Sequence, residues 1–225
     1  MNILEKLIGL VAPHNCIVCD YEGSVLCGGC LNSELTEAIS RCYRCLRVSS
    51  DQAVCRSCRA SVPIPHVWIA TDYGEIPKKL IHKFKFERAV AAAVPIAIKI
   101  DETLPYLPEE TIICHIPTAN NRVRMRGYDQ AAEIAKHLAE IRGYTHKTLL
   151  SRTGKSRQVG SSRTDRFRQL ENAFAIKDSN AIKDAKILLV DDITTTGSTI
   201  ESAAKILKKA GARTIDAAVF AQPSS

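Results

Sequence analysis

The stretch ILLVDDITTTGSTIESAAKIL, residues 187–207, decides the fold. Its first four residues are all apolar, which is typical of a strand buried on both faces, as in a parallel sheet covered by helices. Two acids, Asp191 and Asp192, follow at the carboxyl end of this strand, where open parallel sheets bind their ligands. A turn of small residues then leads into a helix, and it consists of Thr194, Thr195, Thr196, Gly197, Ser198 and Thr199.

The acids and the turn together indicate a sugar phosphate as the ligand. Backbone N–H groups, hydroxyls and the dipole at a helix N-terminus form a cradle for phosphate. The adjacent carboxylates can accept hydrogen bonds from ribose hydroxyls while the turn holds the 5′-phosphate. The chain has no GxxxxGK[ST] motif, and no GxGxxG follows a strand, which disfavours a P-loop nucleotide triphosphatase and a dinucleotide-binding domain.

Strands and helices alternate from His66 onward. The patterns predict strands at 66–73, 111–116, 147–152, 173–176, 186–190 and 214–220. They predict helices at 75–86, 88–100, 128–141 and 198–210, the second interrupted by Pro95, with a basic loop at 117–127 and a mobile loop at 153–168. This alternation predicts an α/β fold with a doubly wound, mostly parallel sheet.

Four CxxC pairs precede that region and include eight of the nine cysteines: Cys16, Cys19, Cys27, Cys30, Cys42, Cys45, Cys55 and Cys58. A two-residue spacer lets both thiolates of a pair reach one tetrahedral metal, so eight thiolates predict two structural Zn²⁺ sites. Hairpin-sized intervening segments favour sequential pairing, and a crossed arrangement stays open. Little apolar periodicity accompanies the cysteines, so we expect the metal to hold this module together. We divide the chain into a zinc-ribbon module at 1–62 and an α/β domain at 63–225.

The chain of 225 residues is 45% hydrophobic and carries a formal charge of +7, which is concentrated in one region. Residues 121–168 hold twelve Lys or Arg against four Asp or Glu, which indicates an anionic partner, either a phosphorylated small molecule or a nucleic-acid backbone. Within the helix expected at 75–86, the solvated face should carry Lys78, Lys79, Lys83 and Lys85. Metal-binding thiols indicate the reducing cytoplasm. The apolar residues 1–13 are too few to insert in a membrane, and we expect a short amphipathic helix there.

The segment 187–207 resembles the motif by which type I phosphoribosyltransferases bind phosphoribosyl pyrophosphate (PRPP). The resemblance implies that Asp191 and Asp192 contact the ribose hydroxyls and act in catalysis. It also implies that the turn residues wrap the 5′-phosphate, and that Mg²⁺ bridges pyrophosphate and ribose oxygens.

Residues 115–135, HIPTANNRVRMRGYDQAAEIA, resemble the signature of the ComF family through Arg122, Arg126, Gly127 and Gln130. Tyr128 and Asp129 stand where the family usually has Phe and Asn. Guanidinium groups bind pyrophosphate oxygens bidentately, so Arg122 and Arg126 are expected at the pyrophosphate, Arg126 in a catalytic role.

A third segment, 152–174, is similar to the ComF family's basic lid. The resemblance suggests that this lid brings four polar side chains over the pyrophosphate: Arg152, Lys155, Arg157 and Gln158. The paired cysteines likewise resemble the double zinc ribbon in front of ComF-like domains.

The family resemblance implies two alternative functions. The first is Mg²⁺-dependent transfer of a phosphoribosyl group to an unidentified acceptor, with a role in DNA uptake during natural transformation. The second is a non-catalytic competence factor that binds single-stranded DNA or protein and keeps PRPP as a regulator. The implied partners are PRPP, single-stranded DNA and competence helicases or other DNA-processing proteins.

Overall fold

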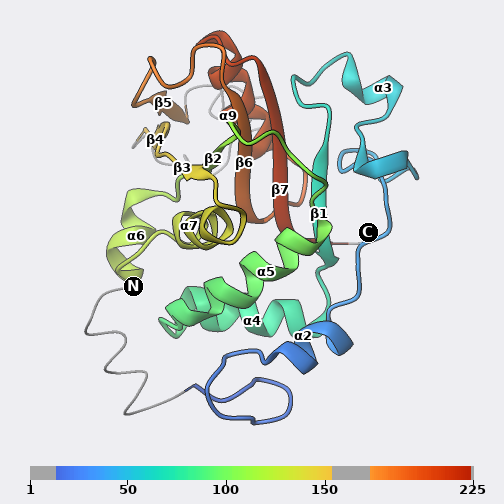
Figure 1. The fold of residues 1–225 in the computed structure, drawn as a ribbon, viewed down its shortest axis with the longest axis vertical. Helices are drawn as coiled ribbons and strands as arrows, with labels where there is room; N and C mark the ends of the chain where they lie inside the picture. Colours follow the sequence, from blue (N-terminus) through green and yellow to red (C-terminus); the bar gives the residue numbers. More distant parts are fainter. Residues whose placement is uncertain (1–13, 154–172, 224–225) are drawn as a thin grey trace, which may run out of the picture.

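Strand β6 (Lys186–Ile193) lies at the centre of a five-stranded sheet with the order β1-β7-β6-β2-β3 (Figure 1). The other strands of this sheet are β1 (Val67–Asp72), β2 (Ile112–His115), β3 (Thr145–His146) and β7 (Thr214–Gln222). All four neighbouring pairs are parallel. The computed structural model describes residues 14–153 and 173–223.

Helices cover both faces of the sheet. The main helices are α4 (Glu75–Phe86), α5 (Ala93–Thr103), α6 (Asn120–Arg126), α7 (Gln130–Arg142) and α9 (Ser198–Lys209). Side chains of β6 alternate between two cores: Leu188 and Val190 pack with α4, α5 and α7, whereas Ile187 and Leu189 pack with α9. The doubly wound parallel sheet is therefore confirmed, with buried strands that are apolar on both faces.

The cysteine-rich segment packs on the same two cores. Its short helices are α2 (Gly28–Glu34), the 3₁₀ turn η1 (Ser50–Gln52) and α3 (Arg56–Arg59). Leu26 and Leu31 belong to the core under α5, and Tyr43 and Val54 belong to the core under α9. We expected metal binding, and not apolar packing, to hold this segment together. That expectation was wrong, because each half of the segment buries apolar side chains against a different face of the sheet.

The cysteine-rich segment crosses from one face of the sheet to the other along the edge strand β1. Single β-bridges join Glu37 to Thr71 and Ala53 to His66. The Gln52 side chain donates to Ile69 O at 3.0 Å and accepts from Ile69 N at 2.5 Å, as a paired strand would. These contacts cover an edge that would otherwise present unpaired backbone groups.

Three sequence predictions of local structure were wrong. Pro95 does not interrupt a helix: after the 3₁₀ turn η2 (Val90–Ala92), α5 begins at Ala93, so Pro95 lies in its first turn, where no N–H partner is needed. The strands expected at 147–152 and 173–176 are shorter, as β4 (Leu150–Arg152) and β5 (Phe174–Ile176). They form a separate antiparallel pair outside the main sheet.

The third wrong prediction is the basic loop at 117–127, which contains helix α6. Gly127 ends this helix with φ of 90°, and its N–H donates to Val123 O at 2.8 Å. This glycine is the C-terminal helix signal that the sequence analysis passed over. The amphipathic helix expected at 1–13 lies outside the described residues. Within the described part of the chain, no helix has the length and apolar character needed to cross a membrane.

Candidate functional site

The acid pair lies within the last residues of β6. Successive side chains of a strand point to opposite faces, so Asp192 shares a face with Val190 and helices α4, α5 and α7, and Asp191 points toward the α9 face. Asp192 is only 8% exposed, and Asp191 is half-buried. The sequence prediction that the strand delivers both acids to the carboxyl edge of the sheet agrees with this placement.

A lysine from another helix neutralises one of these acids. Lys85 Nζ, in the last turn of α4, lies 2.6 Å from Asp192 Oδ2. Burial raises the pKa of Asp191 to about 8, and the neighbouring Asp192 carboxylate is the second cause of this increase. Asp191 of the free protein therefore keeps its proton to a higher pH than an ordinary aspartate, while the Asp192 carboxyl pairs with Lys85.

The small-residue turn runs between β6 and α9. Thr194 is buried and its N–H donates to Ala221 O at 3.1 Å, which fixes the turn to β7, while Thr195 and Thr196 are exposed. Thr196 Oγ1 and Ser198 Oγ lie 3.0 Å apart. Gly197 has φ of 73°, a left-handed conformation that favours glycine, immediately before α9 begins. Exposed hydroxyls at a helix N-terminus can bind a phosphate group.

A basic groove of about 570 Å³ lies between the end of α4 and helix α6, and it is lined by Lys85, Phe86, Arg88, Asn121, Arg122, Met125 and Arg126. Arg122 and Arg126 are one helical turn apart, so they share the face of α6 that lines the groove. The Arg126 guanidinium lies 5.4 Å from the centre of the Phe86 ring and donates to Gln130 Oε1 at 2.7 Å. Lys85 connects this groove with the acid pair.

Asp129 organises the loop that follows β2. Its carboxylate accepts from Thr118 N at 2.8 Å and Thr118 Oγ1 at 3.0 Å, and it caps α7 by accepting from Ala131 N. Asp129 has a negative charge that the Asn usual in the family lacks, and its carboxylate accepts hydrogen bonds from backbone and hydroxyl donors. Tyr128, in place of Phe, donates through its hydroxyl to Phe84 O.

Other predicted residues of the pyrophosphate lid are not all placed. Lys155, Arg157 and Gln158 lie outside the described residues. Arg152 is at the end of β4, with its guanidinium 5.2 Å from the centre of the Phe174 ring.

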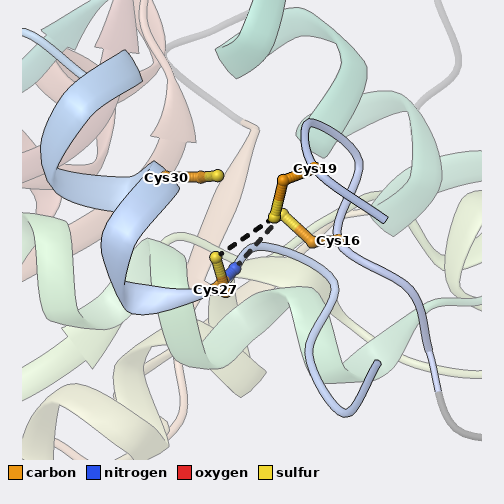
Figure 2. A group of neighbouring side chains, drawn as sticks. All are labelled: Cys16, Cys19, Cys27 and Cys30. Atoms are coloured by element: carbon orange, nitrogen blue, oxygen red, sulfur yellow. Dashed lines mark hydrogen bonds between the residues drawn. The ribbon is translucent and has the colours of Figure 1, made fainter. Parts of the chain in front are cut away.

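The eight paired cysteines form two clusters in the sequential arrangement (Figure 2 shows the first). In each cluster all four Sγ atoms lie within 4.8 Å of one another. Cys19 Sγ is 3.7 Å from Cys27 Sγ, and Cys45 Sγ is 3.5 Å from Cys55 Sγ. Four sulfurs about 2.3 Å from a tetrahedral zinc ion stand roughly 3.8 Å apart, so both clusters fit Zn²⁺.

The thiols of one cluster differ in acidity. In the second cluster, hydrogen bonds from Ser57 and from the Cys58 backbone lower the pKa of Cys55 to about 6. Burial and the adjacent Cys55 raise the pKa of Cys58 to about 12. A negative charge on one sulfur opposes ionisation of the next, and a bound dication is what allows all four to be thiolates together.

Sequence reasoning missed four residues around the site. Lys85 was assigned to a solvated helix face, but it is turned to Asp192. Phe86 and Arg88 line the groove with α6, and Tyr43 of the second cysteine cluster lies against Gly197. No periodicity could reveal these contacts because each joins segments far apart in the chain.

Residues 123–225 match the phosphoribosyl transferase domain. This match and the parallel sheet with helices on both faces define a domain of the phosphoribosyltransferase type, preceded by two zinc ribbons.

Curated relatives cover most of the chain. It is 30% identical to competence protein F of Haemophilus influenzae over 84% of this chain and 81% of that one. It is 28% identical to competence protein ComFC of Streptococcus pneumoniae over 86% of each chain. It is 26% identical to DNA utilization protein YhgH of Salmonella typhi over 92% of this chain and 96% of that one. The chain belongs to the ComF family, that of competence protein F.

Proposed function

We propose that the protein binds PRPP with Mg²⁺ and transfers the phosphoribosyl group to an acceptor. The observation that carries this proposal is the convergence, at one strand end, of three subsites of matching chemistry. The acid pair, the phosphate-binding turn and the basic groove adjoin one another, and Lys85 lies between the acids and the groove. PRPP presents ribose hydroxyls, a 5′-phosphate and a pyrophosphate in the corresponding relation.

Each subsite has one task in this proposal. Asp191 and Asp192 accept hydrogen bonds from the ribose hydroxyls, and Thr195 to Thr199 hold the 5′-phosphate at the start of α9. Arg122 and Arg126 bind the pyrophosphate. Carboxylate oxygens are also ligands that Mg²⁺ prefers, and the bound ion would neutralise charge on the departing pyrophosphate.

The reaction breaks the bond from the ribose anomeric carbon to the pyrophosphate oxygen and forms one from that carbon to the acceptor. The acceptor loses its proton, and pyrophosphate leaves with the bonding electron pair. Positive charge develops on the ribose before the new bond is complete, so the acid pair stabilises it while Arg126 stabilises the leaving group. Lys155 and Gln158 are also proposed to bind the pyrophosphate.

The printed names of the relatives suggest the process that this activity serves. Competence protein F, ComFC and YhgH are named for competence or DNA utilization. We propose the same role here, the uptake and handling of DNA, carried out in the cytoplasm, where thiols stay reduced for metal binding.

Calorimetric titration of Mg²⁺-PRPP into the zinc-loaded protein tests the proposal. The parent and the variant Asp191→Ala/Asp192→Ala are compared with Glu109→Ala/Glu110→Ala. The control removes two adjacent, exposed acids and the same formal charge. Binding that is lost in the first variant and kept in the second supports the site, whereas no binding to the parent overturns the PRPP proposal.

A second function, binding of single-stranded DNA, is favoured by one observation that the sequence did not offer. Phe86 is 68% exposed and Met125 is 75% exposed beside the cations of the basic groove. A flat aromatic ring amid guanidinium groups is a platform on which bases stack while phosphates are held. The aromatic residue comes from α4, outside the basic segment itself.

Binding of a fluorescent oligonucleotide, measured over a range of salt, tests this function. Affinity that falls steeply with salt indicates phosphate contacts. Phe86→Ala should weaken binding by about 1–3 kcal/mol, the usual contribution of one stacked base. Tyr106→Ala is the matched control because Tyr106 is 82% exposed and does not line the groove. Equal effects of the two substitutions would remove the groove from consideration.

A further inference from the structure

The second cysteine cluster lies directly against the phosphate-binding turn. Tyr43 and Arg44 are the two spacer residues between Cys42 and Cys45, so two metal-ligating positions flank them. The Tyr43 ring covers Gly197 so closely that a Cβ atom on this glycine would lie 2.0 Å from Tyr43 Cε2. Any larger residue at 197 would displace the ring or the turn, and Tyr43 itself is only 1% exposed.

Polar contacts fix the same two residues to the helix that follows the turn. Tyr43 Oη donates to Glu201 Oε1 at 2.9 Å, and Arg44 Nε lies 3.4 Å from the same oxygen. Glu201 is 4% exposed in the first turn of α9, and its N–H donates to Gly197 O at 2.9 Å. A carboxylate buried this far is stable only with such partners.

A third contact attaches the segment Cys42–Cys45, which we call the knuckle, to the sheet. Gln222 Nε2, at the end of β7, donates to Tyr43 O at 2.8 Å. Tyr43 therefore contacts the phosphate-binding turn at Gly197, the start of α9 at Glu201, and the end of β7 at Gln222. The first cysteine cluster packs on the opposite face of the sheet, with α5.

We propose that Tyr43 is a positioning residue for the phosphate-binding turn, and that it links metal binding at Cys42, Cys45, Cys55 and Cys58 to phosphate binding at residues 194–199. The cluster at Cys16, Cys19, Cys27 and Cys30 has no such linkage. This inference rests on the proposed PRPP site and deepens it, because it assigns regulation of that site to the zinc supply of one ribbon.

The physical reason is rigidity. A metal ion at the second cluster holds the Cys42–Cys45 knuckle in one shape, and that shape presents the Tyr43 ring and hydroxyl to Gly197 and Glu201. When the metal is absent, the clustered thiols no longer fix the knuckle, and the turn loses the contact that holds its left-handed conformation. Linkage is reciprocal, so a ligand that orders the turn must also tighten binding of the metal at the second cluster.

Equilibrium competition for zinc with a colorimetric chelator measures this linkage in the full-length protein. Cys19→Ser leaves the second cluster as the complete site, and Cys45→Ser leaves the first. In Cys19→Ser, Mg²⁺-PRPP should raise the zinc affinity about fivefold or more, whereas in Cys45→Ser it should have no effect. An equal increase in zinc affinity at both sites, or an increase at the first alone, overturns the linkage.

Amide hydrogen exchange tests the coupling between the second cluster and the turn without PRPP. Loss of metal from the second cluster, in Cys45→Ser, should accelerate exchange at residues 195–201 about tenfold, and loss from the first, in Cys19→Ser, should not. If the parent fails to bind PRPP, this result still decides the linkage, so failure of the PRPP site and failure of the coupling are distinguished. Unchanged exchange in Cys45→Ser, with its zinc content confirmed as reduced, sinks the coupling.

Tyr43→Phe separates positioning from folding. This variant keeps the ring but removes the donor to Glu201, so it should retain both zinc ions and bind Mg²⁺-PRPP about fivefold more weakly. Tyr21→Phe is the control because Tyr21 lies in the first ribbon and is 68% exposed. Should Tyr43→Phe keep parental affinity and parental exchange at residues 195–201, its hydroxyl has no positioning role.

Discussion

Lys85 Nζ lies 2.6 Å from Asp192 Oδ2, which joins the end of α4 to the acid pair at the end of β6. Both side chains are mostly buried, with 20% and 11% of their surfaces exposed. The contact places one cation where two acids would otherwise repel a ligand that carries several phosphate charges.

Replacing Lys85 should weaken binding of Mg²⁺-PRPP. Lys85→Met leaves Asp192 unpaired and removes a cation from the groove, so we expect affinity to fall about tenfold or more. Calorimetry measures the change. Lys79→Met is the control because Lys79 pairs with Glu75 on the exposed side of the same helix. Parental affinity in Lys85→Met would show that the lysine has no part in ligand binding.

Because Asp191 titrates, the free energy of unfolding should fall as pH rises. Its pKa, raised to about 8 by burial and by Asp192, exceeds the value of about 4 in an unfolded chain. Between these values the folded state keeps a proton that the unfolded state has released, so the free energy of unfolding falls as pH increases. The slope from this group is at most about 1.4 kcal/mol per pH unit.

Urea unfolding of the zinc-loaded parent and of Asp191→Asn, at about pH 5.5 and about pH 7.5, checks this prediction. The variant lacks the titrating group, so its stability should fall less over the interval. Taking the difference between the two proteins cancels the opposite contribution of His115, whose pKa burial lowers to about 4. Identical pH dependence in both proteins would contradict the raised pKa.

Arg142 should be important for stability and not for ligand binding. Its guanidinium pairs with the Asp101 carboxylate and donates to Pro105 O at 2.7 Å, Asp101 O at 2.9 Å and Leu104 O at 3.0 Å. These carbonyls lie in the last turn of α5 and just beyond it. Asp101 O also accepts from Leu104 N at 3.1 Å, whereas Leu104 and Pro105 follow the last helical residue. Arg142→Met should lower the free energy of unfolding by about 2–4 kcal/mol.

Urea unfolding at neutral pH measures this change. Arg142→Lys should recover little, because an ammonium group cannot reproduce the planar arrangement of donors. Lys136→Met removes an exposed pair with Glu133 and should change stability by about 0.5 kcal/mol or less. Comparable losses in Arg142→Met and Lys136→Met would refute the assignment.

Metal analysis should find two zinc ions per chain. Cys19→Ser and Cys45→Ser should each retain one, because each cluster closes with four thiolates of its own. Cys114→Ala should retain two, since Cys114 is buried in β2 and its pKa is raised by burial to about 12. Loss of both ions in either Ser variant would indicate one shared site instead.

The sequence was most informative where local pattern and chemistry coincide. The apolar run before Asp191 predicted the central strand, and the spacing of the cysteines predicted two clusters in sequential order. Both signals are contained within a few residues, so long-range packing cannot alter them much. Helix α4 was likewise predicted at its observed bounds, because its apolar residues follow a helical period.

Contacts between distant segments could not be predicted. Lys85 lies about a hundred residues before Asp192, and nothing in the helix pattern distinguishes it from the exposed Lys79. The contact of Tyr43 with Gly197 depends on how the second ribbon docks on α9. Helix α6 was missed for a different reason, since its polar, arginine-rich sequence has no apolar face and only Gly127 marks its end.

The order of the strands has a consequence for how the protein is made. In the described sheet, β1 at the edge pairs with β7, and Tyr43 and Gln222, which share a hydrogen bond, are 179 positions apart. On the ribosome, the eight paired thiols emerge well before β7 and α9, so metal capture can precede docking of the ribbons by many seconds of synthesis. Contacts of such long sequence separation also form slowly. A nascent chain that has already captured its metal must therefore keep the Tyr43 ring from aggregating until α9 and β7 have been made and cover it.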